Sequence, residues 1–269
     1  MKRSQRIYTA LIYLFLYAPI LVLIVLSFNT SNSSMSVDGF TLHGYRELFR
    51  SGHLLRLLGN TLILAVTSSV TATLLGTMAA VGIHGMRGRL RRLVLTVTNI
   101  PMTNPEIVTG VSLAMLFVFF GSWMRHNNIL GFWTLLIAHV TFNLPYVILS
   151  VLPKLRQMDT NLTDAALDLG CTPTSAFFRV TLPEIMPGVV SGMAMAFTLS
   201  LDDFVISYFV SGTSFVTLPV EIYNYVKKPI PTSVYALFTL LFLGILLLLV
   251  MQNVLEARSE RKRMAAQTL

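Results

Sequence analysis

Six long apolar blocks are the feature that most restricts the fold of this 269-residue chain. A membrane-spanning helix needs about 20 mostly apolar residues, because the hydrocarbon core of a bilayer is roughly 30 Å thick. Six segments meet this requirement: Ile7–Phe28, Asn60–Ile83, Leu93–Phe120, Ile129–Val151, Gly188–Val210 and Ser233–Leu255. Charged residues are only 12% of the chain, about half of their usual share in soluble domains. The pattern predicts an all-α polytopic membrane protein, with one membrane domain over residues 1–269.

The basic residues predict how these spans are oriented. With six spans both termini lie on one side, and that side carries 14 of the 20 Lys and Arg residues. They are Lys2, Arg3, Arg6, Arg87, Arg89, Arg91, Arg92, Lys154, Arg156, Arg179, Arg258, Arg261, Lys262 and Arg263. The other side carries Arg46, Arg50, Arg56, Arg125, Lys227 and Lys228. Because cytoplasmic loops are enriched in Lys and Arg, we expect both termini in the cytoplasm.

The first block is long for a signal peptide and has no A-x-A cleavage site after it, so we interpret it as a retained span. The motifs for several enzyme classes are missing from the chain. A single cysteine, Cys171, excludes an internal disulfide and a thiolate metal cage, and the five histidines form no HExxH pair. Glycine is never followed by lysine, so there is no Walker A motif. We therefore expect a transport subunit without catalytic residues, metal or cofactor, and any ATP must be hydrolysed by another chain.

The longest loop on the cytoplasmic side, about residues 152–187, carries signals for two short helices. Thr163 is a possible N-cap, and Gly170 follows the first helix as a C′ residue. Thr172 and Pro173 restart a helix that presents Ala176, Phe177 and Val180 on one side, and Leu182-Pro183 is expected to end it. On these grounds the segment is either an amphipathic connector on the membrane surface or a knob that docks another protein.

Three carboxylates lie within the predicted spans: Glu106, Asp202 and Asp203. A charge at mid-bilayer costs about 2.5–3.5 kcal/mol on insertion scales, so it normally faces a cavity or a partner. None of the six spans contains Lys or Arg. In continuous helices, Glu106 and Asp202 would both lie about 20 Å from the cytoplasmic ends of their spans. Acids at similar depth predict a cavity that selects a cation, most simply one with two or more separated positive charges.

Other interpretations of these acids stay open. Glu106 follows Asn104-Pro105, so it is also consistent with the first-turn acid of a broken helix. One of the two aspartates is equally suited to bond backbone or a partner subunit, and a proton relay is physically allowed. His139 and Asn143 lie four residues apart in the fourth span and are suited to interhelical hydrogen bonds, but we expect both to serve helix packing.

The loop resembles the EAA loop of ABC-importer permeases. Asp164-Ala165-Ala166, then Gly170, then Val180-Thr181-Leu182-Pro183 fill the places of that pattern, with Asp164 in place of the usual Glu. In that family the loop docks in a groove of a cytoplasmic ATPase and transmits its motion. The resemblance implies a type I importer permease fold. It also implies a coupling surface formed by Asp164, Ala165, Ala166, Gly170, Phe177, Leu182 and Pro183.

Further stretches resemble spermidine/putrescine importer permeases. They are YAPILVLIVLSFN in the first span, PMTNPEIVTGVSLAMLF at 101–117 and FTLSLDDFVISYFVSG at 197–212. This resemblance implies that Glu106, Ser200, Asp202 and Asp203 pass the polyamine. It gives Tyr45 an external contact, although relatives often carry Trp-Tyr where this chain has Gly44-Tyr45.

The resemblance also supplies the partners. They are a homologous second permease, two ATPase subunits that bind ATP and Mg, and an extracytoplasmic polyamine-binding protein, all at a bacterial inner membrane. Two alternatives remain. The first is an importer of the same kind for another small solute, such as ferric ion or thiamine. The second is a proton-coupled secondary transporter or channel.

Overall fold

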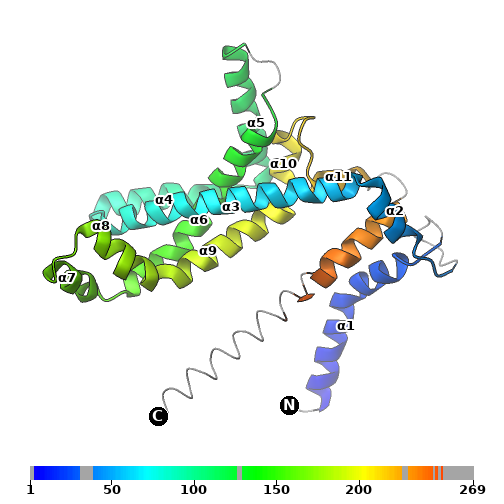
Figure 1. The fold of residues 1–269 in the computed structure, drawn as a ribbon, viewed down its shortest axis with the longest axis horizontal. Coiled ribbons are helices and arrows are strands. Elements are labelled where there is room, and N and C mark those ends of the chain that lie inside the picture. The colour runs from blue at the N-terminus through cyan, green and yellow to red at the C-terminus, as the bar shows by residue number, and fades with distance from the viewer. Residues whose placement is uncertain are drawn as a thin grey trace. The chain divides into compact units, whose positions relative to one another are not determined.

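The computed structural model describes residues 3–30, 39–125, 129–225, 230–244, 246–247 and 250, and within them it is almost entirely helical (Figure 1). Five helices are long and apolar enough to cross a membrane: Gln5–Leu26, His53–Gly85, Glu106–Trp123, Phe132–Gln157 and Pro173–Asp202. A shorter apolar helix, Thr232–Gly244, covers the first half of the predicted sixth span. The rest of that span falls outside the described residues, except for 246, 247 and 250, and so do Lys2, Lys227, Lys228, Arg258, Arg261, Lys262 and Arg263.

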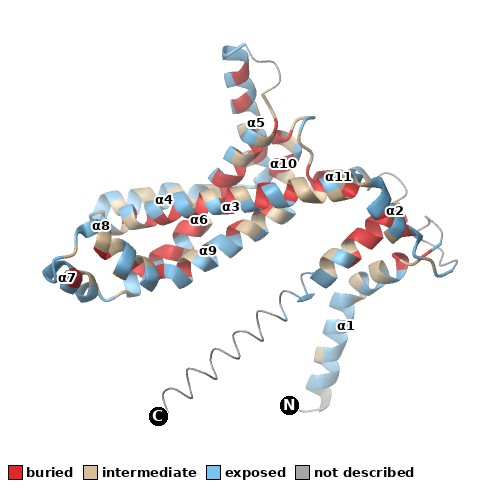
Figure 2. Cartoon of the chain, viewed as in Figure 1, coloured by how far each residue is buried: buried red, intermediate tan, exposed pale blue. Residues whose placement is uncertain are grey.

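The chain divides into two compact units. The first takes in residues 1–56 and 223–269, and the second takes in Leu57–Ile222. The first unit contains α1 (Arg3–Leu26), α2 (His43–Ser51) and the helix Thr232–Gly244. The surface of α1 is almost wholly exposed and apolar, as expected of a helix covered by lipid or by another protein (Figure 2).

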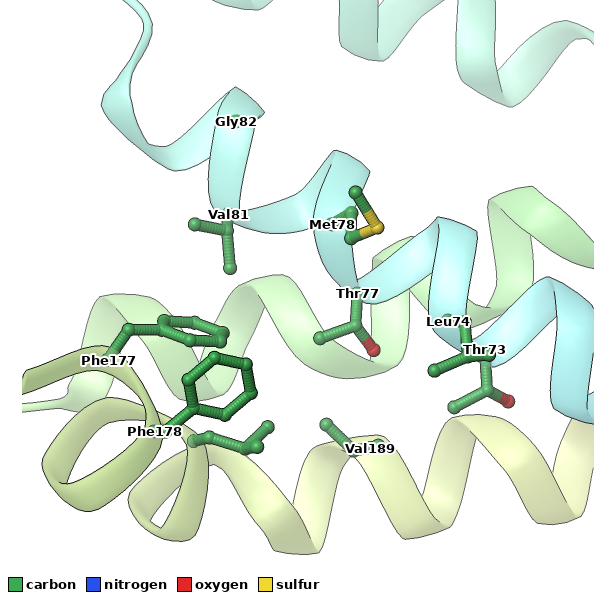
Figure 3. A pocket seen from close by; sticks show the side chains of 10 residues that line it. Thr73, Leu74, Thr77, Met78, Val81, Gly82, Phe177, Phe178 and Val189 are labelled. Atoms are coloured by element: carbon green, nitrogen blue, oxygen red, sulfur yellow. The ribbon is translucent and has the colours of Figure 1, made fainter. Parts of the chain in front are cut away.

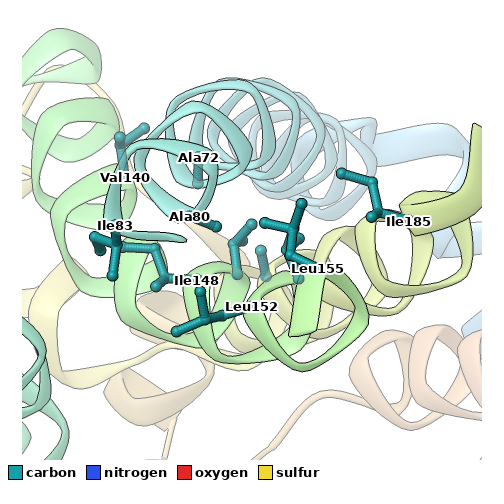
Figure 4. Packing of buried hydrophobic residues seen from close by; sticks show 11 residues of the cluster. Ala72, Ala80, Ile83, Val140, Ile148, Leu152, Leu155 and Ile185 are labelled. Carbon is teal, nitrogen blue, oxygen red and sulfur yellow. The ribbon is translucent and has the colours of Figure 1, made fainter. Parts of the chain in front are cut away.

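The second unit is built on α3 (His53–Gly85, from Leu57), α6 (Phe132–Gln157) and α9 (Leu182–Asp202). A buried aliphatic cluster joins them (Figure 4). Helix α9 approaches α6 closely at Gly188, where a Cβ atom would lie 2.8 Å from the carbonyl oxygen of Ser150. Such small residues let helix backbones pack tightly in membranes, where hydrophobic burial between helices gives little driving force.

Two further pairs of elements complete this unit. Helix α4 (Gly88–Thr103) packs on α6, and α5 (Glu106–Trp123) packs on α10 (Val205–Val210). The docking segment consists of α7 (Thr160–Asp168), α8 (Pro173–Ala176) and a π-helical turn, η1 (Phe177–Thr181). A last helix, α11 (Leu218–Tyr225), begins in this unit and crosses its boundary.

Two predicted spans are not continuous helices. The span expected at Leu93–Phe120 is divided between α4 and α5, and the span expected at Gly188–Val210 is divided between α9 and α10. The depth estimated for Glu106 assumed an unbroken helix and is therefore wrong as stated, whereas the count from Gly188 to Asp202 lies wholly within α9. The helical rise per residue does not hold across a break, because the backbone there adopts extended φ and ψ angles.

Smaller boundaries also differ from the prediction. The structure starts the second span at His53 and the fourth at Phe132, and the fourth continues to Gln157, into the predicted loop. Leu182-Pro183 does not end a helix, because the chain is helical from Pro173 to Asp202. The π turn before Pro183 explains why the helix continues through this proline. Leu182 donates its N–H to the carbonyl of Phe177, five residues back. The hydrogen-bonding pattern has therefore already shifted at the position where proline has no N–H to donate.

Candidate functional site: two helix breaks and a docking segment

The break between α9 and α10 is stabilised by the side chain of Asp203. Its backbone is extended, with φ −61° and ψ 119°. One carboxylate oxygen accepts a hydrogen bond from the N–H of Ile206 at 3.2 Å, and the other accepts one from the N–H of Ser207 at 2.8 Å. The first N–H groups of a helix have no partner within the helix, so this carboxylate caps α10.

The same carboxylate contacts a buried histidine on α6. Nε2 of His139 lies 3.4 Å from Oδ2 of Asp203 and 3.1 Å from Oγ of Ser207. The side chains of His139 and Asp203 are only 2% and 5% exposed. The Asp203 carboxylate therefore already has partners within this chain: two backbone N–H groups and one imidazole.

A second polar contact lies one turn earlier along α9. The buried hydroxyl of Ser200 accepts a hydrogen bond from Nδ2 of Asn143 at 2.8 Å and lies 2.8 Å from the hydroxyl of Ser68 on α3. This contact joins α3, α6 and α9. Asn143 and His139 thus do more than fill space between helices, contrary to our expectation for them. Buried polar groups inside a membrane need such partners.

The break between α4 and α5 has a different cause. Asn104 adopts φ −77° and ψ 143°, and Pro105 adopts φ −56° and ψ 133°. A residue before proline is pushed out of the helical region by the proline ring, and proline itself has no N–H to donate. Glu106 is consequently the first residue of α5, where its charge suits the positive end of the helix dipole. This matches the second interpretation given above for Glu106.

The two breaks lie side by side. Gly110, one turn after Glu106, packs against the backbone of Val205 and Ile206 in the first turn of α10. The Glu106 and Asp202 side chains are both exposed. Among the described residues, no Lys or Arg lies within ion-pair distance of either carboxylate.

Tyr45 belongs to the first unit and is engaged there. Its hydroxyl lies 2.8 Å from Oγ of Ser27, and its ring lies 5.2 Å from that of Phe28. The side chain is half-buried, so part of the ring is open to a ligand.

The docking segment is an ordered helix–turn–helix. Asp159, not Thr163 as predicted, caps α7 by accepting the N–H of Asn161, so the helix begins earlier. Gly170 has φ +86° and ends α7 as predicted, with Cys171 donating to the carbonyl of Ala166. Thr172 caps the next helix as predicted, accepting the N–H of Ser175.

Only part of the predicted coupling surface faces outward. Asp164, Ala165, Gly170 and Pro183 are exposed, whereas Ala166 is buried and Phe177 and Leu182 are half-buried. Phe177 instead lines cavities beside α3. The most exposed large apolar side chains of the segment are Leu169, which is 87% exposed, and Phe178, which is 63% exposed; Leu162 and Leu167 are exposed to a smaller extent.

A signal for the His139–Asp203 contact was present in the sequence. His139 and Asn143 are four residues apart, and Ser200, Asp203 and Ser207 are three or four apart. In the continuous spans that the sequence predicts, both sets form a polar line on one face of an apolar helix. Two such lines on neighbouring spans predict a contact between the two spans. We did not expect this contact when each residue was considered by itself.

The sequence from residue 72 to residue 261 matches the family described as "Binding-protein-dependent transport system inner membrane component". The chain belongs to this family. Among curated relatives, the spermidine/putrescine transport system permease protein PotC of Escherichia coli (strain K12) is 39% identical over 251 residues, covering 93% of this chain and 92% of the relative. The putrescine transport system permease protein PotI of the same strain is 37% identical over 257 residues, covering 93% and 90%.

Solved structures show the same fold for this family member. A bacterial ABC transporter involved in import of the acidic polysaccharide alginate matches with a TM-score of 0.66 at 14% identity, over 94% of this chain and 98% of that one. The inward-facing MetNI methionine ABC transporter matches with a TM-score of 0.58 at 21% identity, over 75% and 93%. The all-α fold is therefore that of an ABC-importer permease, as the EAA-like loop predicted.

Proposed function

We propose that this family member is the transmembrane permease subunit of an ATP-driven importer that passes polyamines, spermidine and/or putrescine, across the bacterial cytoplasmic membrane. The observation that carries the proposal is the pair of exposed carboxylates, Glu106 and Asp202, at adjacent helix breaks. The names of the relatives that are 37–39% identical support the cargo.

The chemistry of the breaks suits a polyamine. Discontinuous helices in transporters present helix ends to the cargo at membrane depth. The last carbonyl groups of α4 and α9 have no partner within their helices and carry partial negative charge. Together with Glu106 and Asp202 they offer two separated anionic positions. A chain with two or more protonated amines can contact both at once and pass from one to the other.

The acids divide into two roles in this proposal. Glu106 and Asp202 contact the cargo. Asp203 and Ser200 hold the α9–α10 break, because their polar atoms are already bonded to α10, His139, Asn143 and Ser68. This departs from the resemblance, which assigned all four residues to the cargo. Tyr45 remains a proposed external contact.

The docking segment couples the chain to ATP hydrolysis in this proposal. Two cytoplasmic ATPase subunits bind ATP and Mg, and one of them receives the surface formed by Asp164, Ala165 and Leu169. Both termini then lie in the cytoplasm, in accord with the distribution of basic residues. A second, homologous permease and an extracytoplasmic binding protein complete the importer, and both units of this chain act as one permease domain.

The test is ATP-dependent uptake of labelled spermidine and putrescine into vesicles that contain the complete complex. We expect Asp202→Asn and Glu106→Gln each to reduce uptake by roughly tenfold or more, because each removes a transition-state contact worth at least about 1.4 kcal/mol. Glu184→Gln, which removes an exposed acid from the first turn of α9, is the matched control and should leave uptake unchanged.

Each outcome of this test is informative. Uptake by the unaltered complex that is lost in Asp202→Asn, with the complex intact, supports the proposal. No uptake of either polyamine would refute the cargo and favour an importer for another small solute. Uptake that continues without ATP, driven by a proton gradient, would refute ATP coupling and favour a secondary transporter.

A further inference from the structure

Two grooves on the second unit differ in the charge of their linings. The larger, of about 600 Å³, lies between α3 and the helix that runs from η1 into α9, and its lining is apolar apart from two threonines (Figure 3). No charged side chain lines it among the described residues. The smaller, of about 340 Å³, lies on α4 and is lined by Arg89, Arg92, Leu93, Thr96 and Val97. Of the two, the groove on α4 has charges that can select a ligand.

The lining residues of the smaller groove share one face of α4. Their spacing, at positions 89, 92, 93, 96 and 97, is that of neighbours on a helix surface. All five are exposed. The other face of α4 carries Val94 and Leu95, which pack against the buried cluster of α3, α6 and α9. The face with the arginines is therefore turned away from the core of this unit.

The two arginines have no counter-charge nearby. No Asp or Glu occurs between Glu47 and Glu106 in the sequence. Within the part of the chain that the structure describes, neither Arg89 nor Arg92 has a side-chain hydrogen bond or an ion pair. They lie three residues apart, so their like charges repel, and Arg89 is in the first turn of α4, where the helix dipole also disfavours a cation. An anion from outside the chain would offset both effects.

The arginines lie at the same end of the unit as the docking segment. Helix α3 ends at Gly85 and α4 begins at Gly88, and a cavity lined by His84 of α3 and Phe177 of the docking segment joins the two regions. Arginines at the end of a span lie among the lipid headgroups, where they orient the span. Orientation by charge needs no particular helix face, whereas these two arginines share a face with apolar side chains.

Beyond the arginines this face of α4 becomes apolar. Leu93 and Val97 are 62% and 56% exposed, and Val97 lies eight residues after Arg89, roughly 12 Å along the helix. Thr96 already donates its hydroxyl to the carbonyl of Arg92, so the guanidinium groups are the donors that remain. The face thus has a cationic end followed by an apolar end, which is the order of the phosphate and the acyl chains in a phospholipid.

We propose that this face of α4 binds an anionic phospholipid, with its phosphate on Arg89 and Arg92 and its acyl chains along Leu93 and Val97. Guanidinium groups pair with phosphate oxygens through two parallel hydrogen bonds, and basic clusters beside a span attract anionic lipids. A soluble partner would cover only the arginines, and an apolar helix of another subunit only the aliphatic side chains. An anionic amphiphile matches both ends. This goes beyond the proposed function and requires only that the chain spans a membrane.

The first test is quenching of tryptophan fluorescence by brominated lipid. Leu93→Trp is introduced into the full-length chain together with Trp123→Phe/Trp133→Phe, which removes both native tryptophans. The chain is reconstituted in phosphatidylcholine, and phosphatidylglycerol or phosphatidylcholine with brominated acyl chains is added. We expect phosphatidylglycerol to bind roughly 25-fold more tightly, about fivefold for each arginine. Bromine on an acyl chain quenches only a nearby tryptophan, so free phosphate cannot produce this signal.

A control position tests whether the preference belongs to this groove. Met78→Trp, in the same background, reports on the uncharged groove, because Met78 lines it and is 71% exposed. Both brominated lipids should quench it equally. Equal quenching of Leu93→Trp by the two lipids would overturn the proposal.

Substitution of the arginines tests their part in the site. Arg89→Gln and Arg92→Gln should each reduce the preference for phosphatidylglycerol at Leu93→Trp by about fivefold. Arg179→Gln removes the same charge from an exposed arginine outside the groove and should leave the preference unchanged. Arg89→Lys/Arg92→Lys keeps both charges and should retain most of it. An equal loss in Arg179→Gln would show attraction to the basic surface as a whole and would overturn the site.

The complete complex tests which molecule covers this face. A benzoylphenylalanine at Val97 should give products with the mass of this chain plus phospholipid. Products with an ATPase subunit or a second permease in their place would overturn the proposal. None of these measurements uses polyamine, so failure of polyamine uptake and failure of lipid selectivity are separate results, and each refutes a different proposal.

Discussion

The two helix breaks of this permease look alike in the fold but are made differently. At Asn104-Pro105 the proline disfavours a continuous helix, because it has no N–H to donate and its ring pushes Asn104 out of the helical region. Other prolines of the chain, among them Pro101 and Pro187, lie inside helices. At Asp203 nothing in the backbone disfavours a continuous helix, and the break depends on a carboxylate that caps α10 and contacts His139. The first break should therefore persist when side chains nearby are changed, whereas the second should depend on two particular side chains.

The largest effect should come from Asp203→Ala. It removes the cap of α10 and leaves His139 buried without its carboxylate partner. Breaking a buried pair by removing one member costs about 3–5 kcal/mol. We expect a much lower unfolding midpoint for the purified complex in a thermal or denaturant series. Asp203→Asn retains one acceptor for α10, so its unfolding midpoint should lie between those of Asp203→Ala and the unaltered protein. Equal midpoints for Asp203→Ala and the unaltered protein would show that the break needs no carboxylate.

Ser200→Ala should have the next largest effect. It leaves the Nδ2 group of Asn143 without an acceptor in a buried position, which costs about 1–3 kcal/mol. The same unfolding series measures it. Ser122→Ala is a suitable control, because the Ser122 hydroxyl is exposed and bonds only to the carbonyl of Val118 in its own helix. If both variants lose the same stability, the contact among α3, α6 and α9 contributes nothing of its own.

Pro105→Ala should change stability by less than about 1 kcal/mol, since Pro105 is exposed and alanine keeps the carbonyl that accepts the N–H groups of Val108 and Thr109. Its effect should be on shape: with alanine, α4 and α5 can join as one helix and carry Glu106 away from α10. Pulsed spin-label distances between Val97→Cys and Val118→Cys, in a chain with Cys171→Ser, would lengthen. If the spin-label distance is unchanged and uptake is retained, the packing on α10, and not Pro105, determines this break.

Asp202→Asn should have the smallest effect on stability, within about 0.5 kcal/mol, because its side chain is exposed and has no partner among the described residues. Its neighbour Asp203 should thus dominate stability while Asp202 dominates uptake. The unfolding midpoint and the uptake rate, measured on the same preparations, separate the two. A large drop in midpoint for Asp202→Asn would contradict this division of roles.

The spans, the proline break and the docking segment followed from local signals. Apolar runs, Asn104-Pro105, Gly170 and Thr172-Pro173 each act within a few residues, so sequence alone predicts them. The α9–α10 break did not follow, because it depends on His139, about 60 residues away along the chain. Propensity within Gly188–Val210 favours one continuous helix, and only the contact with α6 makes the capped break preferable.

The roles of Asp202 and Asp203 show the same limit. Two adjacent aspartates cannot be told apart by residue type, and the resemblance gives both the same role. Their environments differ because the chain turns between them: one is exposed and the other is 5% exposed beside His139. Likewise, the inward orientation of Phe177 depends on the π turn, which no local pattern predicted.

The helix that runs from Pro173 to Asp202 without interruption affects how motion can pass along this chain during transport. These 30 residues form one helical body from the docking segment to the α9–α10 break, roughly 45 Å at the usual rise. An α-helix turns by about 100° per residue, and the π turn η1 within this body departs from that value. In the proposed importer, a rotation of the docking segment against the ATPase would be carried along this one helical body to Asp202.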